Sequence, residues 1–192
     1  QNENYSHPDM PENTQEGIIK GLYCIQEAKP DMPKVRLLGS GSLLREAKAA
    51  AELLEKDWNI TSEIWSVTSY SELRKESENI RRWNTLHPNK KQKTCWLNQN
   101  LGDCSSPIIA VSDYVKLVSE QIAAYTPCSF SALGTDGFGR SDNRESLREF
   151  FEVNRFYIVL SAINALYKEG KLDQSVVLNS IEKYKIDTEK PN

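Results

Sequence analysis

The sequence has few histidines and no closely spaced cysteines, and both absences limit the chemistry it can perform. Its two histidines, His7 and His87, lie far from the spacing of a zinc site. The cysteines form no Cys-x-x-Cys pair; they are Cys24, Cys95, Cys104 and Cys128. No Ser–His–Asp, Cys–His or metal-ligand set can be assembled from these residues, so they predict a binding or packing domain and not a self-sufficient catalyst.

Long apolar runs and a strong net charge are also missing. No apolar run approaches the roughly 20 residues that a membrane-spanning helix needs, and the polar start QNENYSHPDMPEN is unlike a signal peptide. The net charge is −3, so nothing global indicates nucleic acid or an anionic membrane as a partner. We therefore expect a cytoplasmic protein with reduced thiols; a Cys95–Cys104 disulfide would need an oxidising compartment.

There is no initial methionine, and the first residues are rich in proline and asparagine. We interpret residues 1–14 as the end of an interdomain linker, and we expect the chain to be a fragment of a larger protein. The 192 residues, of which 39% are hydrophobic and 27% charged, suffice for one good-sized domain. We expect that domain at 15–186 and a tail at 187–192.

Strand-like and helix-like segments alternate along the chain. Strands are predicted at 35–38, 63–67, 108–111 and 130–134. Helices are predicted from about 43 to 58, 70 to 83, 113 to 125, 143 to 151, 155 to 168 and 174 to 185. Residues 17–28 fit a short helix or a strand, and 84–107 read as a long loop. This alternation predicts a mostly parallel sheet covered on both faces, with ligands or partners at the carboxyl ends of its strands.

Residues that favour helix ends mark several of these boundaries. The predicted N-caps are Ser42, Ser112, Asp142 and Asp173. Asp142 and Glu145 have the spacing of a capping box, and Gly170 stands where a helix commonly ends in a glycine.

The segment from Leu133 to Arg148, LGTDGFGRSDNRESLR, carries three glycines in six residues. Such a loop between a strand and a helix commonly faces a ligand, another domain or another subunit. Its candidate contact residues are Asp136, Phe138, Arg140 and Asp142. The charged side chains could instead pair with one another or cap the helix, and composition alone favours a tight strand-to-helix turn.

Two further segments allow a functional and a structural interpretation. Ser40, Gly41 and Ser42 open a helix and could hold an anion, although they match neither a P-loop nor a dinucleotide fingerprint, and a tight turn is favoured. Residues 81–88, RRWNTLHP, followed by three lysines, could dock to an acidic surface. The alternative is a solvated loop in which His87 is a packing residue.

Five segments, in order and spread over nearly the whole chain, resemble one family. They are NENYSHPDMPE (2–12), LLGSGSLLR (37–45), SEIWSVTSYSEL (62–73), RWNTLHP (82–88) and LGTDGFGRSDNRESLR (133–148). They look like the carboxy-terminal domain of the homodimeric, bacterial-type pyruvate dehydrogenase decarboxylating component. RWNTLHP and GTDGFGRSD together are specific for it, whereas residues 90–106 match little of it.

The resemblance implies a transketolase carboxy-terminal-like fold, a three-layer α/β/α sandwich with a mostly parallel five-stranded sheet. Since four strands are predicted, the fifth is expected in residues 17–28 or in the nineties. The resemblance also implies thiamine diphosphate and Mg²⁺ in the parent enzyme, bound by the amino-terminal and middle domains, so no catalytic, cofactor or metal residue is assigned to this chain.

The implied partners are those two domains, a second subunit of a homodimer and the dihydrolipoyl acetyltransferase core. The implied parent reaction is decarboxylation of pyruvate, the step that follows glycolysis, with acetylation of lipoyl groups. This domain would then be structural and inactive alone, with the loop at 134–142 at the active-site entrance or at an interface. The alternatives are a regulatory module that binds an anion or nucleotide, and the same domain of another 2-oxo acid dehydrogenase or a transketolase.

Overall fold

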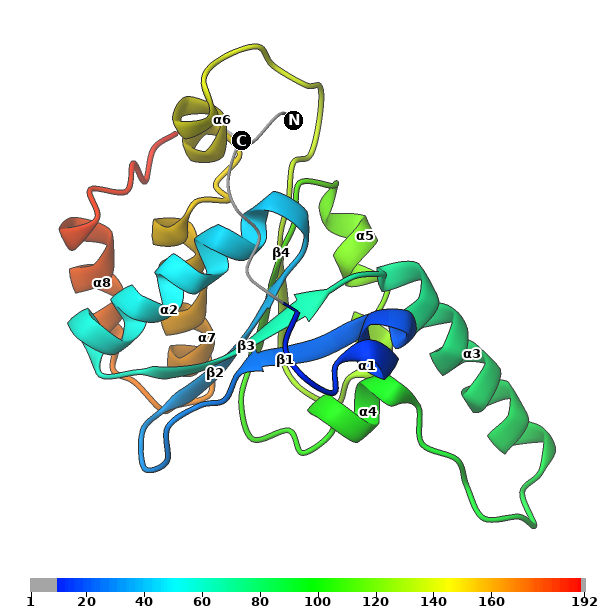
Figure 1. Ribbon diagram of the computed structural model, residues 1–192. Helices are drawn as coiled ribbons and strands as arrows, with labels where there is room; N and C mark the ends of the chain where they lie inside the picture. The colour runs from blue at the N-terminus through cyan, green and yellow to red at the C-terminus, as the bar shows by residue number, and fades with distance from the viewer. Residues whose placement is uncertain (1–9, 191–192) are drawn as a thin grey trace.

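A five-stranded sheet lies between two layers of helices in the computed structural model, which describes residues 10–190 (Figure 1). The strands are β1 (Leu22–Gln26), β2 (Lys34–Gly39), β3 (Thr61–Val67), β4 (Ile108–Val111) and β5 (Phe130–Leu133). Their order is β1-β3-β2-β4-β5, and only β1 is antiparallel to its neighbour. The predicted fold class is confirmed, and the fifth strand is β1. Most of the predicted linker lies outside the described residues.

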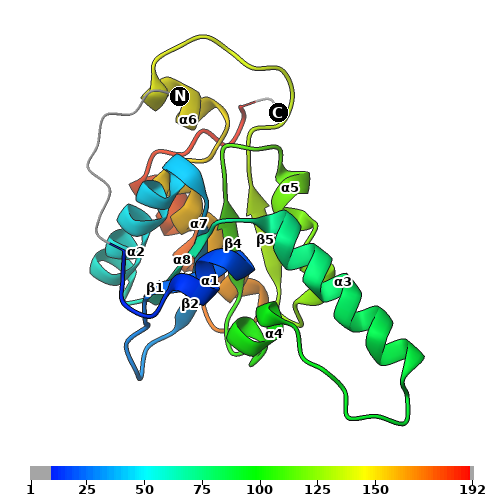
Figure 2. The same ribbon diagram turned by 45° about the vertical axis from the view of Figure 1, so that its right-hand side comes forward.

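Helices cover both faces of the sheet. They are α1 (Gln15–Lys20), α2 (Leu44–Trp58), α3 (Tyr70–Leu86), α4 (Trp96–Leu101), α5 (Lys116–Glu120), α6 (Arg144–Phe150), α7 (Arg155–Lys168) and α8 (Gln174–Lys183), with 3₁₀ turns η1 (Gly41–Leu43) and η2 (Ala123–Tyr125). Helices α2, α7 and α8 lie over one face, and α3, α4 and α5 lie over the other (Figures 1 and 2). Helix α6 lies beyond the end of the sheet, beside the loop that follows β5.

The central strands are buried on both faces, which explains their nearly continuous apolar sequence. On β2, Val35 and Leu37 join the core under α2 and α7, whereas Leu38 joins the core under α3 and α4. Helix α2 presents alanines and leucines at helical spacing to the first core, as the sequence predicts. Each leucine that is completely buried contributes about 1.5–3 kcal/mol through the hydrophobic effect.

The prediction of a continuous loop over 84–107 was wrong, because α4 lies within it. This helix has only six residues, too few to be stable by themselves, so no strong periodicity marks it. Tertiary contacts hold it: Leu97 and Leu101 are fully buried, and the Trp96 indole N–H donates to the Leu22 carbonyl at 2.9 Å.

The prediction of one continuous helix over 113–125 was also wrong in the helix's extent. Only α5 and the short η2 form there, because residues 113–115 are held by the loop after β5. The Thr135 N–H donates to the Tyr114 carbonyl at 2.9 Å, and the Thr135 hydroxyl donates to the Asp113 carbonyl. Ser112 therefore does not cap a helix; its hydroxyl accepts from the Tyr114 N–H in a local turn.

Two other predicted N-caps are displaced. Ser42 lies inside η1, and its hydroxyl donates to Asp113. The cap of α6 is Asn143, whose side chain accepts from the Ser146 N–H, so the capping box predicted for Asp142 is wrong by one residue. Asp173 does precede α8, without a side-chain cap bond, and Gly170 turns the chain after α7 with φ +71°.

Candidate functional site

The segments at 39–42 and 134–142 meet at the carboxyl edge of the sheet, as expected from the parallel strands (Figure 2). Asp113, which follows β4, joins them. Its carboxylate accepts from the Ser42 hydroxyl at 2.8 Å, and its carbonyl accepts from the Thr135 hydroxyl. The sequence prediction missed Asp113, although its place directly after a buried strand could have identified it.

The base of the loop after β5 is tightly constrained. A Cβ added at Gly134 would lie 2.5 Å from the Tyr114 carbonyl oxygen, so only glycine fits there. The Asp136 carboxylate accepts from the Lys116 N–H at 2.9 Å and lies 3.6 Å from the Lys116 ammonium. Asp136 thus binds the start of α5, which is a structural role.

The tip of the same loop is open. The Phe138 side chain is 95% exposed, and a Cβ on the flanking Gly137 or Gly139 would meet nothing within 4 Å. Three more exposed apolar side chains lie before and in α5, on the segment that the base of the loop binds; these are Tyr114, Val115 and Leu117. We call these four side chains the apolar patch. A patch beside a constrained loop is typical of a contact surface.

The four predicted contact residues do not form one cluster. The Arg140 guanidinium lies over the Phe150 ring at 3.9 Å from the ring centroid, a cation–π contact. The Asp142 carboxylate accepts from the neighbouring Asn143 N–H at 2.7 Å. Asp136 therefore binds α5, and Asp142 acts within the loop. Arg140 contacts α6, and Phe138 reaches outward.

A cavity of about 290 Å³ lies between this loop and α6. It is lined by Asp113 and Thr135 on the sheet side and by three arginines on the other, Arg140, Arg144 and Arg148. Arg144 and Arg148 lie one turn apart on the same face of α6, a spacing that the sequence prediction overlooked, whereas Arg140 belongs to the loop before α6. The lining holds no pair of nucleophile and general base, so its chemistry is that of binding and positioning.

The wall of the cavity is anchored by a buried carboxylate, Glu46 of α2. It accepts from Arg155 at 3.0 Å and lies 3.1 Å from an Arg148 guanidinium nitrogen. Burial opposes ionisation of Glu46, but the hydrogen bonds from Arg155 outweigh it and lower the pKa of that carboxyl. Glu46 therefore stays charged and fixes α6 and α7 against α2.

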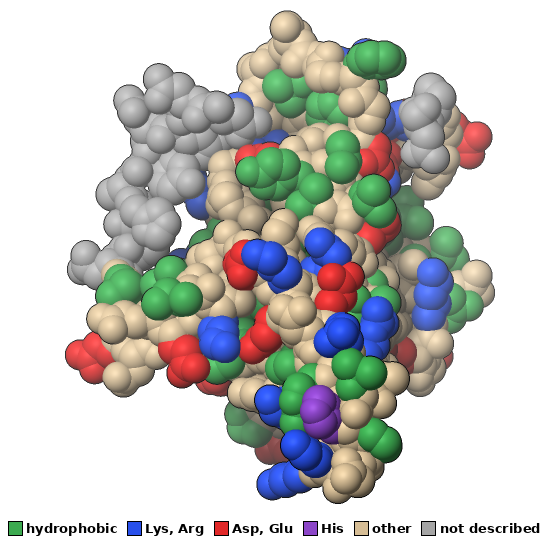
Figure 3. Space-filling view, turned by 90° about the vertical axis from the view of Figure 1, so that its right-hand side faces the viewer, with side chains coloured by type: hydrophobic (Ala, Val, Ile, Leu, Met, Phe, Trp, Pro, Cys, Tyr) green, Lys and Arg blue, Asp and Glu red, His purple; other side chains and the backbone are tan. Residues whose placement is uncertain are grey.

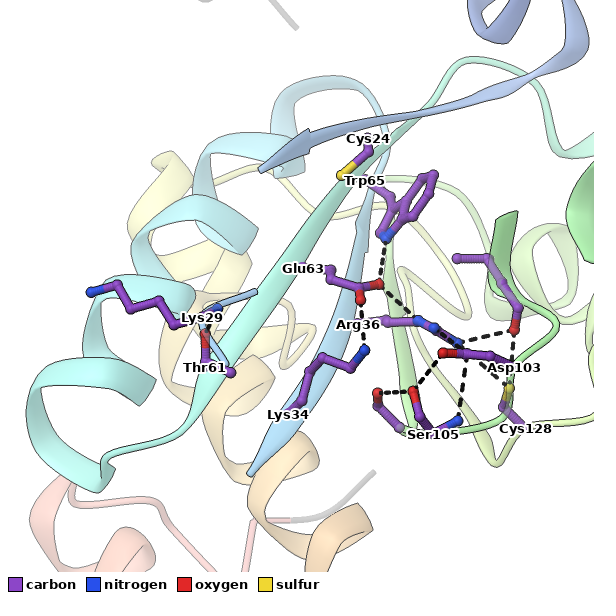
Figure 4. Close-up of polar contacts among 12 residues, drawn as sticks. Cys24, Lys29, Lys34, Arg36, Thr61, Glu63, Trp65, Asp103, Ser105 and Cys128 are labelled. Carbon is purple, nitrogen blue, oxygen red and sulfur yellow. Dashed lines mark hydrogen bonds and ion pairs between the residues drawn. The ribbon is translucent and has the colours of Figure 1, made fainter. Parts of the chain in front are cut away.

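A second polar cluster lies at the opposite, amino edge of the sheet (Figure 4). Arg36 of β2 has a side chain only 2% exposed. It donates to Glu63 at 2.8 Å, to the Leu101 carbonyl at 3.0 Å and to Asp103. Lys34 binds the other Glu63 oxygen at 2.8 Å. We call this set the Arg36 network.

The electrostatics of the Arg36 network follow from these bonds. Burial opposes ionisation of Asp103, but its hydrogen bonds with Arg36 and Ser105 outweigh that effect and hold its pKa at about 2. The pKa of Glu63 is lowered in the same way, with bonds from Lys34 and Arg36 prevailing over burial. Each charge is compensated, which is typical of a structural cluster.

A third region, residues 81–93, projects from the body of the molecule, and we call it the basic arm. No Asp or Glu occurs from 79 to 102, whereas five cations do: Arg81, Arg82, Lys90, Lys91 and Lys93. Within residues 10–190 none of the five forms an ion pair. Figure 3 shows a histidine, the only one in the described part of the chain, among these cations.

The basic arm has a defined conformation. The His87 ring stacks on Trp83 with centroids 4.5 Å apart, and its Nδ1 lies 2.8 Å from the Trp83 carbonyl. Asn84 and Lys93 exchange two hydrogen bonds of 2.9 Å, and the Lys93 ammonium lies 4.1 Å from the Trp83 ring centroid. His87 is thus a packing residue, as the structural interpretation held, and the arm presents its charges from a rigid base.

Residues 10–190 contain neither a metal-binding cluster nor a membrane-spanning helix. Among residues 10–190, no three or more His, Cys, Asp or Glu side chains are grouped so that they could hold a metal ion. No helix in the same part of the chain is both long and apolar enough to cross a bilayer.

Comparisons with known proteins agree with the fold. A sequence profile described as "Transketolase-like TK C-terminal domain" matches residues 21–154. Two transketolases of known structure, from Leishmania mexicana and Pichia stipitis, superpose with TM-scores of 0.54 and 0.55 at 20% identity. They align with 80% and 81% of this chain and with 19% of their own. At that identity the likeness establishes the fold alone.

Relatives of higher identity match the whole chain. It is 48% identical to the pyruvate dehydrogenase E1 component of Pseudomonas aeruginosa and 45% identical to that of Escherichia coli K12. Both alignments cover 100% of this chain but only 22% and 21% of the relative. The chain therefore spans about a fifth of the length of the curated relatives it matches.

Proposed function

Because the chain belongs to the transketolase-like C-terminal domain family, as a domain of the pyruvate dehydrogenase E1 component, we propose that it supports the structure and dimerisation of an enzyme subunit. That subunit decarboxylates pyruvate with thiamine diphosphate and Mg²⁺ and acetylates lipoyl groups of an acetyltransferase core. The observation that carries this proposal is the 42–48% identity to proteins of that name over the full length of the chain.

The composition of the carboxyl edge supports an accessory role for this domain. Thiamine diphosphate supplies carbanion chemistry when it is bound, so the protein has to bind, orient and shield the reacting groups. The cavity beside Arg140 offers cations and the Asp113 carboxylate, without a nucleophile paired with a general base. We assign the cofactor, by resemblance, to parts of the subunit outside this chain, and the loop at 134–142 to the active-site entrance or an interface.

The apolar patch supports docking onto the remainder of the subunit or onto its dimer partner. The exposed fractions are 95% for Phe138, 62% for Tyr114 and 70% for Leu117. Exposure of apolar side chains to water is unfavourable, and a contact with another domain would remove that free-energy cost. The constrained base at Gly134 and Thr135 holds this surface in a fixed geometry, so little conformational entropy is lost when it docks.

The anion-binding alternative is less well supported by the surroundings of Ser40, Gly41 and Ser42. The Asp113 carboxylate binds the Ser42 hydroxyl and lies 3.9 Å from a Cβ placed on Gly41. A negative charge at that position repels a phosphate, and η1 has only three residues. A titration of a nucleotide that shifted the amide resonances of Gly39 to Leu43 would revive this alternative.

The proposal is tested on the full-length parent protein. Thiamine-diphosphate-dependent oxidation would be measured with an artificial electron acceptor, using pyruvate, 2-oxoglutarate and a ketose phosphate as substrates. We expect a strong preference for pyruvate. Preference for another substrate would indicate that the chain belongs to another 2-oxo acid dehydrogenase or to a transketolase. No activity on any of the three substrates would refute the proposal.

The basic arm supports a contact with an acidic protein surface of the complex. Its charges have no acidic neighbours in sequence and stand on a rigid base, which suits long-range steering of an acidic partner. In the parent enzyme, replacing Lys90, Lys91 and Lys93 by Glu should slow the complete lipoyl-dependent reaction at low salt. The reaction with an artificial acceptor should not change.

A matched control variant makes the same change in net charge at three lysines outside the basic arm. Lys56, Lys168 and Lys185 are exposed and lie outside the arm. Their replacement by Glu should leave both reactions unchanged. Equal effects of the two triple variants would contradict a specific role for the arm.

A further inference from the structure

Two thiols from distant parts of the chain lie together beside the Arg36 network. Cys104 belongs to the loop between α4 and β4, and Cys128 lies just before β5, so both stand at the amino edge of the sheet. Figure 4 shows Cys128 beside Asp103, the residue before Cys104. Cys104 directly follows Asp103, whose carboxylate binds the same guanidinium that the Cys128 sulfur approaches at 3.8 Å. The Cys104 side chain also contributes to raising the pKa of the Cys128 thiol. Cys104 is exposed, whereas Cys128 is half-buried.

The Arg36 network fixes this arrangement on both sides of Cys104. The Leu101 carbonyl accepts from Arg36 at 3.0 Å and from the Cys128 thiol at 3.3 Å, and Asp103 pairs with the same guanidinium. The Arg36 Nη1 atom also lies 3.8 Å from the Cys128 sulfur. The loop is thereby held against the segment that carries Cys128.

The backbone at Cys104 is itself unusual. Its φ is +52°, in the left-handed region that residues with a side chain rarely adopt. Such a conformation persists only where the surroundings impose it, and here the bonds of Leu101 and Asp103 to Arg36 do so. The strained turn therefore keeps the exposed thiol beside Cys128.

We propose that Cys104 and Cys128 form an oxidation site, at which a peroxide converts the two thiols into a disulfide. The Cys104 sulfur attacks the peroxide and breaks its O–O bond, which gives a sulfenic acid and releases water or an alcohol. The Cys128 sulfur then displaces the hydroxyl group from Cys104; an S–S bond forms, and the thiol proton leaves with the hydroxide as water. Two thiols are oxidised and one peroxide is reduced.

The order of these steps follows from exposure. Cys104 reaches solvent and therefore meets the peroxide first. Burial, with the neighbouring Cys104 thiol, raises the pKa of Cys128 to about 11, so Cys128 is mainly a thiol at neutral pH. Cys128 therefore reacts second, once Cys104 has become a sulfenic acid beside it.

The other two cysteines lack these properties. Cys95 is 5% exposed within the core under α3 and α4. Cys24 donates to the Gln26 carbonyl at 3.3 Å, and burial, followed by the charge of Glu27, raises its pKa to about 12. Neither contacts another thiol in the described chain, so neither is placed to resolve a sulfenic acid.

The disulfide would tie the loop before β4 to the start of β5. Both ends of this link lie at the opposite edge of the sheet from the cavity beside Arg140. We therefore expect oxidation to raise the thermal midpoint of unfolding and to leave binding at the carboxyl edge intact.

The test uses the full-length parent protein, treated with a few equivalents of hydrogen peroxide, alkylated and digested with trypsin without reduction. Cleavage at Lys93, Lys116 and Arg140 gives the peptides 94–116 and 117–140. We expect these peptides as one disulfide-linked species whose amount rises with peroxide and disappears on reduction. The link should be absent in Cys104→Ser and in Cys128→Ser.

The control is Cys95→Ser, because Cys95 shares the first peptide with Cys104. That variant should still form the linked species. A disulfide within 94–116 alone, or oxidation of Cys104 only to sulfinic acid while Cys128 stays alkylated, would overturn the proposal. A linked species that also forms in Cys104→Ser would overturn it too, and none of these outcomes depends on whether the parent acts on pyruvate.

Discussion

Charged side chains gather at both edges of the parallel strands, but their surroundings differ. At the amino edge, Arg36 is 2% exposed and meets a carboxylate or carbonyl on each side. At the carboxyl edge, Arg140 lies on a ring beside a cavity, and the neighbouring Phe138 is almost completely exposed. A compensated buried charge holds elements together, whereas exposed cations and rings beside a cavity form a surface for contacts.

The largest expected difference between the edges is in stability. Arg36→Met removes the guanidinium and leaves the buried Glu63 with Lys34 but without its second cation, so the free energy of unfolding should fall by about 3–5 kcal/mol. Arg140→Met should change it by less than about 0.5 kcal/mol, because its ring contact is on the surface. Urea unfolding of the purified chain measures both, and equal losses would contradict the comparison.

The glycines of the loop after β5 sharpen the comparison within one segment. Gly134→Ala places a Cβ 2.5 Å from the Tyr114 carbonyl oxygen and 2.9 Å from the Lys116 nitrogen. Because these are backbone atoms, which cannot move aside easily, we expect the free energy of unfolding to fall by about 1–3 kcal/mol. Gly139→Ala meets nothing within 4 Å and serves as the matched control, with a change below about 0.5 kcal/mol. Thermal unfolding would show a lower midpoint for the first variant alone.

Acid should destabilise the amino edge of the sheet through Asp103. The pKa of Asp103 is lowered from 3.8 to about 2, so below pH 3.8 the unfolded chain binds more protons than the folded one. Stability that is present above this range is therefore lost as the pH falls through it. Asp103→Asn should flatten this dependence in unfolding curves recorded between these pH values, and an unchanged slope would argue against the role of Asp103.

The smallest effect on the chain itself is expected at the tip of the loop. Phe138→Ser should change the free energy of unfolding by less than about 0.5 kcal/mol, since the ring is 95% exposed. In the full-length parent the same change should weaken the dimer, measured by sedimentation at decreasing protein concentration. Leu178→Ser, on exposed α8, is the control; if it weakened the dimer equally, the apolar patch would have no special role.

Local pattern predicted most of the fold. The alternation of apolar strands and amphipathic helices indicated the parallel sheet, and its strand ends located the segments at 39–42 and 134–142 correctly. The failures occurred where tertiary contacts override local preference: α4 is held by Leu97 and Leu101 in the core, and Thr135 prevents the helix predicted from residue 113. The N-cap of α6 was missed because Asp142 and Asn143 are both good caps.

By itself the sequence determined the fold class, the resemblance to its family and the charge asymmetry of the basic arm, because these depend on residue types and their spacing. Only the tertiary structure decided which side chains meet. Arg36 with Asp103, Asp113 with Ser42, and Cys104 with Cys128 are separated by dozens of residues or lie on different loops. Periodicity carries information over a few turns of chain, whereas these pairs depend on strand order and on the paths of loops between strands.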